Sequence, residues 1–346
     1  MTALRSIDAP APERVPDEAI DFLRELGTPT VIRVRGTDST RVRIVVTLLH
    51  GNEPSGLRAM HAWLRNGERP AVDTRFVIAG MEPALLPPAF TNRFVPGRRD
   101  LNRCFMGPFG GPEGRLARAI LDMVGDAAPE AVIDLHNNTG HSPAYGVGPV
   151  IGTLERSLAG LFGERFVVTH LEIGALVEVI PNAITVECGL AGDPRADAIA
   201  LDGLRRFLVA PTLDDLPSPA RLELLVDPMR VQIRSEASVA IADAPLPGVD
   251  FTLMADVDRH NFETLPAGAP LGWLRVGAPW PLEAIGADGR DHSHTLFDRV
   301  DDRLAARRDL IPIMMTTDVG IARSDCLFYA VRRAERPIIL GPPIDR

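Results

Sequence analysis

Two short strings of the chain combine the side chains that a hydrolytic metal site needs. They are His50-Gly51-Asn52-Glu53 and Asp134-Leu135-His136-Asn137. A catalytic zinc ion takes three protein ligands from imidazole nitrogen and carboxylate oxygen and keeps a fourth position for water, and two His plus one Glu is a recurrent set. The sequence therefore predicts one zinc ion per chain, bound by His50, Glu53 and His136.

The segments before these strings are typical of buried strands. Arg43–Leu49 and Ala131–Leu135 are nearly continuous apolar runs that end at His50 and His136, and a third run, Ala183–Val186, is followed by Glu187. Such runs indicate strands buried on both faces of a sheet. Ligands of open α/β sheets bind beyond the carboxyl ends of the strands, so these three ends are expected to meet in one crevice.

Helical patterns alternate with these runs in the first part of the chain. They cover residues 54–65, 112–124, 154–162 and 194–208. This alternation predicts an α/β fold with a mostly parallel mixed sheet flanked by helices. After a Pro-rich stretch the runs become short and β-like, which predicts a smaller β-rich C-terminal domain. The predicted division is an N-terminal arm (1–15), a zinc-binding catalytic α/β domain (16–210), a linker (211–220) and the β-rich domain (221–346).

Composition excludes several classes of function. The 346 residues carry a net charge of −9 without a basic patch, so no nucleic-acid partner is expected. No apolar run approaches the roughly 20 residues of a membrane span, and the N-terminal residues do not read as a signal peptide, so we expect a cytoplasmic protein without a membrane partner. The three Cys are widely spaced and predict neither a disulfide framework nor a thiolate zinc site.

All 37 basic residues are Arg, because the chain contains no Lys. This excludes a Schiff-base lysine and the lysine of a phosphate-binding P-loop. An anionic substrate must therefore be held by Arg, whose planar guanidinium binds a carboxylate through two parallel hydrogen bonds.

With these motifs placed, the chain resembles the succinylglutamate desuccinylase/aspartoacylase family of zinc amidohydrolases, which are related to the zinc carboxypeptidases. The resemblance covers roughly residues 40–330. It is carried, in the family's order, by HGNEPSG (50–56), RDLNRCF (99–105), DLHN (134–137) and VECG (186–189). It implies a carboxypeptidase-like fold and a zinc-dependent deacylase that cleaves the amide bond of a small N-acyl amino acid.

The resemblance also implies roles for individual residues. Glu187 would be the general base that takes a proton from the attacking water, and Asn102 and Arg103 would hold the substrate's free α-carboxylate. Asp100 would orient the first histidine ligand. Asp134, two positions before His136, is an alternative for that role.

Other roles are less sharply placed. The family uses an arginine upstream of RDLNRCF to stabilise the oxyanion, and Arg93 is the nearest match, with Arg98 and Arg99 as alternatives. The only two tyrosines, Tyr145 and Tyr329, are candidates for substrate contact or for packed strand residues.

One departure from the family bears on the substrate. Aspartoacylase-like enzymes place an Arg shortly before the catalytic Glu to bind a second carboxylate, but residues 167–193 contain none. We therefore expect a substrate with one anionic end, held by Arg103, and a neutral or apolar group that faces residues 171–180. Two alternatives stay open: a metallocarboxypeptidase-like peptidase, and a catalytically silent relative that only binds ligands. A homo-oligomer is possible.

Overall fold

The part of the chain that the structure describes contains two β-sheets and eight α-helices. This computed structural model describes residues 4–217, 219 and 221–334. The larger sheet contains β1 (Arg5–Asp8), β2 (Thr30–Val34), β3 (Asp38–Thr47), β4 (Val72–Ile78), β5 (Ala131–Asn138), β6 (Tyr145–Gly148), β7 (Arg165–Val168), β8 (Ala183–Leu190), β9 (Glu223–Ile233), β13 (Leu282–Ile285), β16 (Ile311–Ile313) and β17 (Phe328–Arg333). The smaller sheet contains β10 (Val239–Ala242), β11 (Phe251–Met254), β12 (Pro270–Leu274), β14 (Phe297–Val300) and β15 (Arg303–Ala306).

The helices are distributed along the whole chain. They are α1 (Ala19–Leu26), α2 (Ser55–Asn66), α3 (Met81–Leu85), α4 (Gly111–Ala127), α5 (Thr153–Gly160), α6 (Pro194–Val209), α7 (Ser293–Leu296) and α8 (Val319–Ser324). Short 3-10 helices are η1 (Pro12–Arg14), η2 (Leu101–Arg103), η3 (Leu176–Glu178) and η4 (Val257–His260). Local sequence explains several ends. For example, α6 begins after Asp193, whose side chain accepts a hydrogen bond from Arg195 N, and α2 ends at Gly67 in the left-handed conformation.

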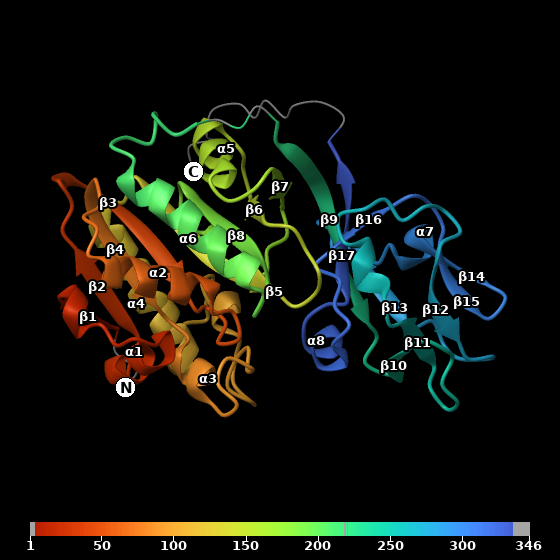
Figure 1. Cartoon of the computed structure of the whole chain (residues 1–346). Helices are drawn as coiled ribbons and strands as arrows, with labels where there is room; N and C mark the ends of the chain where they lie inside the picture. Colours follow the sequence, from red (N-terminus) through yellow and green to blue (C-terminus); the bar gives the residue numbers. More distant parts are fainter. Residues whose placement is uncertain (1–3, 218, 220, 335–346) are drawn as a thin grey trace.

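The centre of the larger sheet is parallel and covered on both faces. Its strand order is β1-β2-β4-β3-β5-β8-β6-β7-β9-β17-β16, with β13 paired to β9, and the run β4-β3-β5-β8 is parallel throughout. Side chains alternate between two cores. Val45 and Ile133 face the core that α2 and α6 complete, whereas Ile44 and Val132 face the core of α4. Figure 1 shows α2 and α6 together on one face and α4 on the other. Burial on both faces explains why these strands are continuously apolar.

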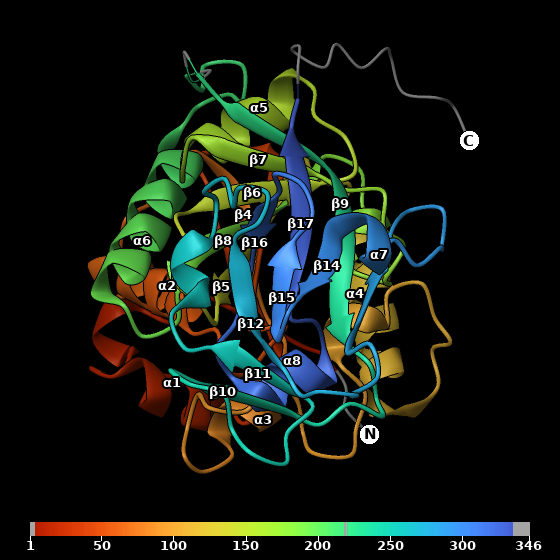
Figure 2. The same ribbon diagram turned by 90° about the vertical axis from the view of Figure 1, so that its right-hand side faces the viewer.

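The larger sheet continues into the C-terminal part of the chain. β9 pairs in parallel with β7 and antiparallel with β17, and β16 follows β17 at the edge. The smaller sheet packs beside this extension around its own core, which includes Phe251, Phe297 and Phe328. In Figure 2, which turns this side toward the viewer, the strands of the smaller sheet lie in front, and Figure 1 shows β9 and β17 between them and the helix-covered strands. The extension therefore joins the C-terminal part of the chain to the helix-covered strands of the larger sheet.

The predicted fold class is confirmed: a mixed sheet flanked by helices is joined to a β-rich C-terminal part. The helical patterns correspond to α2, α4, α5 and α6. The segment predicted as an arm contains β1, which pairs with β2. The predicted domain boundaries stay a prediction. Among the described residues, no helix is both long and apolar enough to cross a membrane.

Candidate active site

Neighbouring strands of the larger sheet bring the predicted site residues together. His136 lies in β5 and Glu187 in β8, near the carboxyl ends of these strands, and the two residues are register partners in the parallel pair. His50 and Glu53 lie in the loop between β3 and α2. Because β3 and β5 are also parallel neighbours, this loop reaches the same edge of the sheet, as predicted from the three apolar runs.

The loop that carries His50 and Glu53 is fastened to β5 by polar contacts. Ser55 N donates to Asn137 Oδ1 at 3.0 Å, Asn137 Nδ2 donates to Ser55 Oγ at 2.9 Å, and Asn137 N donates to Glu53 Oε2 at 3.2 Å. Gly51 is needed for a close approach, because a Cβ atom there would lie 2.5 Å from the backbone nitrogen of Ala84. These contacts fix the loop relative to His136.

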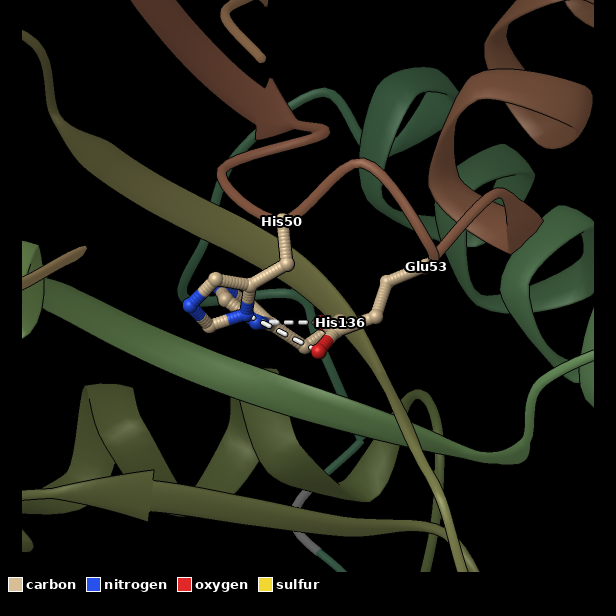
Figure 3. Close-up of side chains that lie close together, drawn as sticks. All are labelled: His50, Glu53 and His136. Atoms are coloured by element: carbon tan, nitrogen blue, oxygen red, sulfur yellow. Dashed lines mark hydrogen bonds and ion pairs between the residues drawn. The ribbon is translucent and has the colours of Figure 1, made fainter. Parts of the chain in front are cut away.

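The three predicted ligands form a buried cluster (Figure 3). His50 Nδ1 lies 2.9 Å from Glu53 Oε1, and His136 Nδ1 lies 2.7 Å from Glu53 Oε2. Their ligand atoms all lie within 4.8 Å of one another, and this is the one such group of His, Cys, Asp or Glu found among the described residues. Both imidazoles thus point the same ring nitrogen toward one carboxylate.

The other ring nitrogens face two further carboxylates. His50 Nε2 lies 3.1 Å from Asp100 Oδ1, and His136 Nε2 lies 2.7 Å from Asp134 Oδ2. The sequence left Asp100 and Asp134 as competitors for one histidine, but each faces a different one. Burial disfavours the charged form of Asp100, yet His50 and Arg93 outweigh it and hold the pKa of Asp100 well below its usual range.

This donor set fits a catalytic zinc ion. Two imidazole nitrogens and one carboxylate converge, and each histidine is oriented by an outer carboxylate, as metal-ligating histidines commonly are. Burial disfavours charge on His136, but the flanking Asp134 and Glu53 outweigh it and raise the pKa of His136 well above its usual value. The same imidazoles suit other divalent ions, so the geometry supports a metal site without selecting zinc.

Glu187 faces the same pocket with an unsatisfied oxygen. Its side chain is 6% exposed, and Glu187 Oε2 has no hydrogen-bond partner among the residues described. Burial raises the pKa of Glu187 to about 8, with His136 acting in the opposite direction. A carboxyl group that titrates near neutral pH is suited to general acid–base catalysis.

Of the three candidate oxyanion arginines, only Arg93 lines the pocket of the triad. Its Nη1 lies 3.5 Å from Glu53 Oε1, and its Nε donates to Asp100 Oδ2 at 3.0 Å. Arg98 instead pairs with Glu82 and Glu113, and Arg99 donates to the backbone oxygen of Pro108. The geometry therefore favours Arg93 over Arg98 and Arg99, among which the sequence alone did not choose.

Asn102 and Arg103 also line the pocket, from η2 and its end. Asn102 Oδ1 accepts a hydrogen bond from Leu176 N at 3.0 Å, and this contact does not use the side-chain amide nitrogen of Asn102. Arg103 Nη1 donates to the backbone oxygen of Asn102 at 2.9 Å. The backbone of Gly174 packs on Arg103, because a Cβ atom at Gly174 would lie 2.8 Å from Arg103 O.

The two tyrosines are both buried at this pocket. Tyr145 is the antiparallel register partner of Glu187, and its hydroxyl donates to Asn138 Oδ1 at 3.3 Å. Tyr329 lies in β17. Burial raises the pKa of both hydroxyl groups, so both stay protonated donors near neutral pH. Their positions fit substrate contact, and both rings also pack in one apolar cluster.

Two further acidic residues line the pocket that the sequence did not indicate, Asp325 and Glu178. Asp325 follows α8 and contacts Arg93, Arg103 and Arg230. Glu178 accepts from Gly174 N at 2.8 Å and holds the loop before η3. Asp325 lies between α8 and β17, and a lone acidic residue in such a short connection carries no signal for a site, so only the fold locates it.

The pocket contains an apolar wall in addition to these polar groups. We define the apolar wall as the side chains of Val147, Val167, Leu171, Ile173, Ala175 and Val177. The C-terminal part contributes Ile313, Met314, Asp325 and Tyr329 to the lining. Residues from both the N-terminal and the C-terminal part of the chain therefore line the pocket that contains His50, Glu53 and His136.

Comparison with known proteins identifies the domain that carries the triad. Residues 39–203 match the family model described as the succinylglutamate desuccinylase/aspartoacylase catalytic domain. No curated protein matches the chain in sequence.

Solved structures with this fold cover most of the chain. Murine aminoacylase 3 is 19% identical with a TM-score of 0.55 and covers 86% of this chain and 97% of its own. Succinylglutamate desuccinylase from Vibrio parahaemolyticus is 16% identical with a TM-score of 0.59 and covers 92% and 96%. The ectoine utilization protein EutE from Ruegeria pomeroyi is 18% identical with a TM-score of 0.54 and covers 87% of each chain.

Proposed function

Because the catalytic domain of this chain belongs to the succinylglutamate desuccinylase/aspartoacylase family, we propose that the protein is a zinc-dependent deacylase. It hydrolyses the amide bond of a small N-acyl amino acid to a carboxylate and a free amine. The observation that carries this proposal is Glu187, a buried carboxyl group with an unsatisfied oxygen, beside His136 and in the same pocket as His50 and Glu53.

His50, Glu53 and His136 hold the metal in this proposal. A zinc ion bound there supplies Lewis-acid polarisation of the amide carbonyl and makes water easier to deprotonate. Glu187 takes the proton from the attacking water and passes it to the nitrogen of the leaving amine. Its unsatisfied Oε2 leaves the carboxyl group available for this exchange.

Arg93 is the residue we assign to the developing oxyanion. It is buried against Glu53 and Asp100, and these contacts hold its guanidinium in place before the substrate arrives. A preorganised donor of this kind contributes on the order of 3 kcal/mol to the barrier when it faces the charge that develops in the transition state. Asn102 and Arg103 bind the α-carboxylate and so position the scissile amide.

The apolar wall supports an acyl group without charge. Five of its six members come from the segment 167–193, which contains no Arg: Val167, Leu171, Ile173, Ala175 and Val177. A second carboxylate on the acyl group would lose its hydration against this apolar surface, and no additional cation there would pair with it, which is unfavourable. The substrate class is therefore an N-acyl amino acid with one carboxylate and a neutral or apolar acyl group.

The enclosure of the pocket favours a small substrate over a peptide. Met314, Asp325 and Tyr329 line the pocket from the C-terminal part of the chain, where a peptidase needs an open groove for its peptide. A peptidase thus remains the second candidate, and a silent binding relative the third. The latter is disfavoured because the ligand set and Glu187 are all present.

A hydrolysis screen tests the proposal. Purified holoenzyme and Glu187→Gln are incubated with N-acyl amino acids that differ in acyl chain and in charge, and release of the free amine is measured together with bound zinc. We expect neutral acyl substrates to be cleaved faster than N-acetylaspartate or succinylglutamate, and Glu187→Gln to keep its zinc but lose about 10²-fold or more in kcat. Equal rates for the two proteins would refute the mechanism.

A further inference from the structure

The carboxylate of Asp325 lies against the guanidinium groups of the proposed substrate site. Asp325 Oδ1 is 3.3 Å from Arg103 Nη2, and Asp325 Oδ2 is 3.3 Å from Arg93 Nη2. Its side chain is 12% exposed, so it forms these contacts largely out of water. Arg103, the residue that is to hold a substrate carboxylate, thus already contacts a carboxylate of the chain.

Asp325 is held in this position from outside the pocket. Arg230 Nη2 donates to Asp325 Oδ1 and to the backbone oxygen of Asp325, both at 2.8 Å, and Gln232 Nε2 donates to the same backbone oxygen at 2.8 Å. Both donors lie in β9. These contacts are shorter than those to Arg93 and Arg103, so Arg230 and Gln232 are the anchor of Asp325.

Asp325 stays charged in this environment. Burial disfavours its charged form, but Arg93, Arg103 and Arg230 outweigh burial and lower the pKa of Asp325. A substrate carboxylate that approaches Arg103 therefore meets a second negative charge at short range. Like charges that share a partly buried site repel each other strongly, because little water screens them.

We propose that Asp325 is a resident counter-ion of the carboxylate subsite, which Asn102 and Arg103 form. Asp325 determines how strongly this subsite binds a carboxylate relative to a neutral group. The substrate's carboxylate competes with Asp325 for Arg103, while Arg230 and Gln232 keep Asp325 at the edge of the pocket. One added carboxylate is accommodated, because Arg103 has further donors, but its binding is weakened. This inference rests on the proposed function, since it takes Asn102 and Arg103 as the site of the α-carboxylate.

Direct binding tests this competition without turnover. N-acetyl-L-leucine and its neutral counterpart N-acetyl-L-leucinamide are titrated calorimetrically into zinc-loaded Glu187→Gln, with and without Asp325→Asn. We expect Asp325→Asn to strengthen binding of the acid by about ten-fold, a conservative fraction of the repulsion, and to change binding of the amide by less than about two-fold. A purely structural role of Asp325 predicts weaker binding of both compounds.

A second variant gives the opposite sign. Arg230→Met removes the closest partner of Asp325 and leaves its carboxylate to Arg93 and Arg103, so binding of the acid should weaken while that of the amide holds. This variant also decides the question if Asp325→Asn does not fold. Asp298→Asn is the matched control, because Asp298 forms a half-exposed ion pair with Arg307 in the same part of the chain, and it should change neither affinity.

The outcomes separate the two proposals. Parallel changes for acid and amide, or weaker acid binding in Asp325→Asn, overturn the role of Asp325. Absence of hydrolysis by the native enzyme in the screen above refutes the deacylase, whatever the binding data show. The competition is supported most strongly if Glu187→Gln alone binds the amide more tightly than the acid and the added Asp325→Asn substitution makes the acid the tighter ligand.

Discussion

Zinc binding should displace a proton from His136, because both ring nitrogens of this residue face carboxylates. His136 Nδ1 lies 2.7 Å from Glu53 Oε2, and His136 Nε2 lies 2.7 Å from Asp134 Oδ2. These short contacts, together with the raised pKa of His136, favour a hydrogen on each nitrogen, so we expect the metal-free ring to be an imidazolium. A metal ion can coordinate Nδ1 only after that proton has left.

The size of the effect follows from the raised pKa of His136. Burial opposes protonation of the ring, but Asp134 and Glu53 raise its pKa well above the ordinary value of 6.5. While the metal-free ring is protonated, each unit of pH changes the apparent zinc dissociation constant about ten-fold. Affinity should therefore rise between about pH 6 and pH 8, by at most about ten-fold for each unit of pH.

A chelator competition assay measures this dependence. Metal-free protein competes with a chromogenic chelator for zinc at several pH values, after correction for protonation of the chelator. Asp134→Asn removes one of the two facing carboxylates, lowers the pKa of His136, and should flatten the dependence at a lower pH than in the native protein. Asp258→Asn is the matched control, since Asp258 Oδ2 also lies 2.7 Å from a histidine, His141, but outside the triad.

Zinc affinity that does not vary over this pH range would refute the reasoning. It would mean that His136 is neutral before the metal binds and that Asp134 and Glu53 do not control its charge. A dependence that is identical in native protein and Asp134→Asn would retain the proton but remove Asp134 as its cause. Altered dependence in Asp258→Asn would point to a global effect.

Three further outcomes are expected. Metal-free protein should lose stability as the pH rises from about 5 to 8. Folded Glu187 keeps its proton up to a pH of about 8, whereas the unfolded group loses it near 4.5, so the folded state binds more protons in this window. Urea unfolding of Glu187→Gln should show a smaller loss of stability over the same range. Gly174→Ala, at φ +81° and against Arg103 O, should cost about 1–2 kcal/mol in stability and raise KM, whereas Gly97→Ala, at φ +78° with open space, should leave KM unchanged. Leu171→Arg places a cation in the apolar wall, so the ratio of kcat/KM for a succinyl substrate to kcat/KM for a butyryl substrate should rise about ten-fold. Leu171→Met should leave this ratio unchanged.

The parallel centre of the larger sheet and the group of His50, Glu53 and His136 were predictable because their sequence signals are local. Each of the three apolar runs is buried on both faces, and each places its chemical group near the carboxyl end of a parallel strand. Such a run needs no knowledge of its neighbours to be recognised. Segments whose burial depends on partners gave weaker signals. Residues 231–241 look like one β-like segment in sequence, but the structure divides them between β9 and β10, which belong to different sheets.

The sequence by itself indicated the three candidate ligands, the buried Glu187 at the end of a strand and the absence of an arginine before it, since residue type and strand position suffice for these. Only the tertiary structure decided which of the neighbouring arginines faces the site and which histidine each aspartate orients, because those depend on side-chain direction in a loop. It alone also revealed Asp325. This residue is brought to Arg103 by the antiparallel pairing of β9 and β17, a long-range contact that no local pattern records.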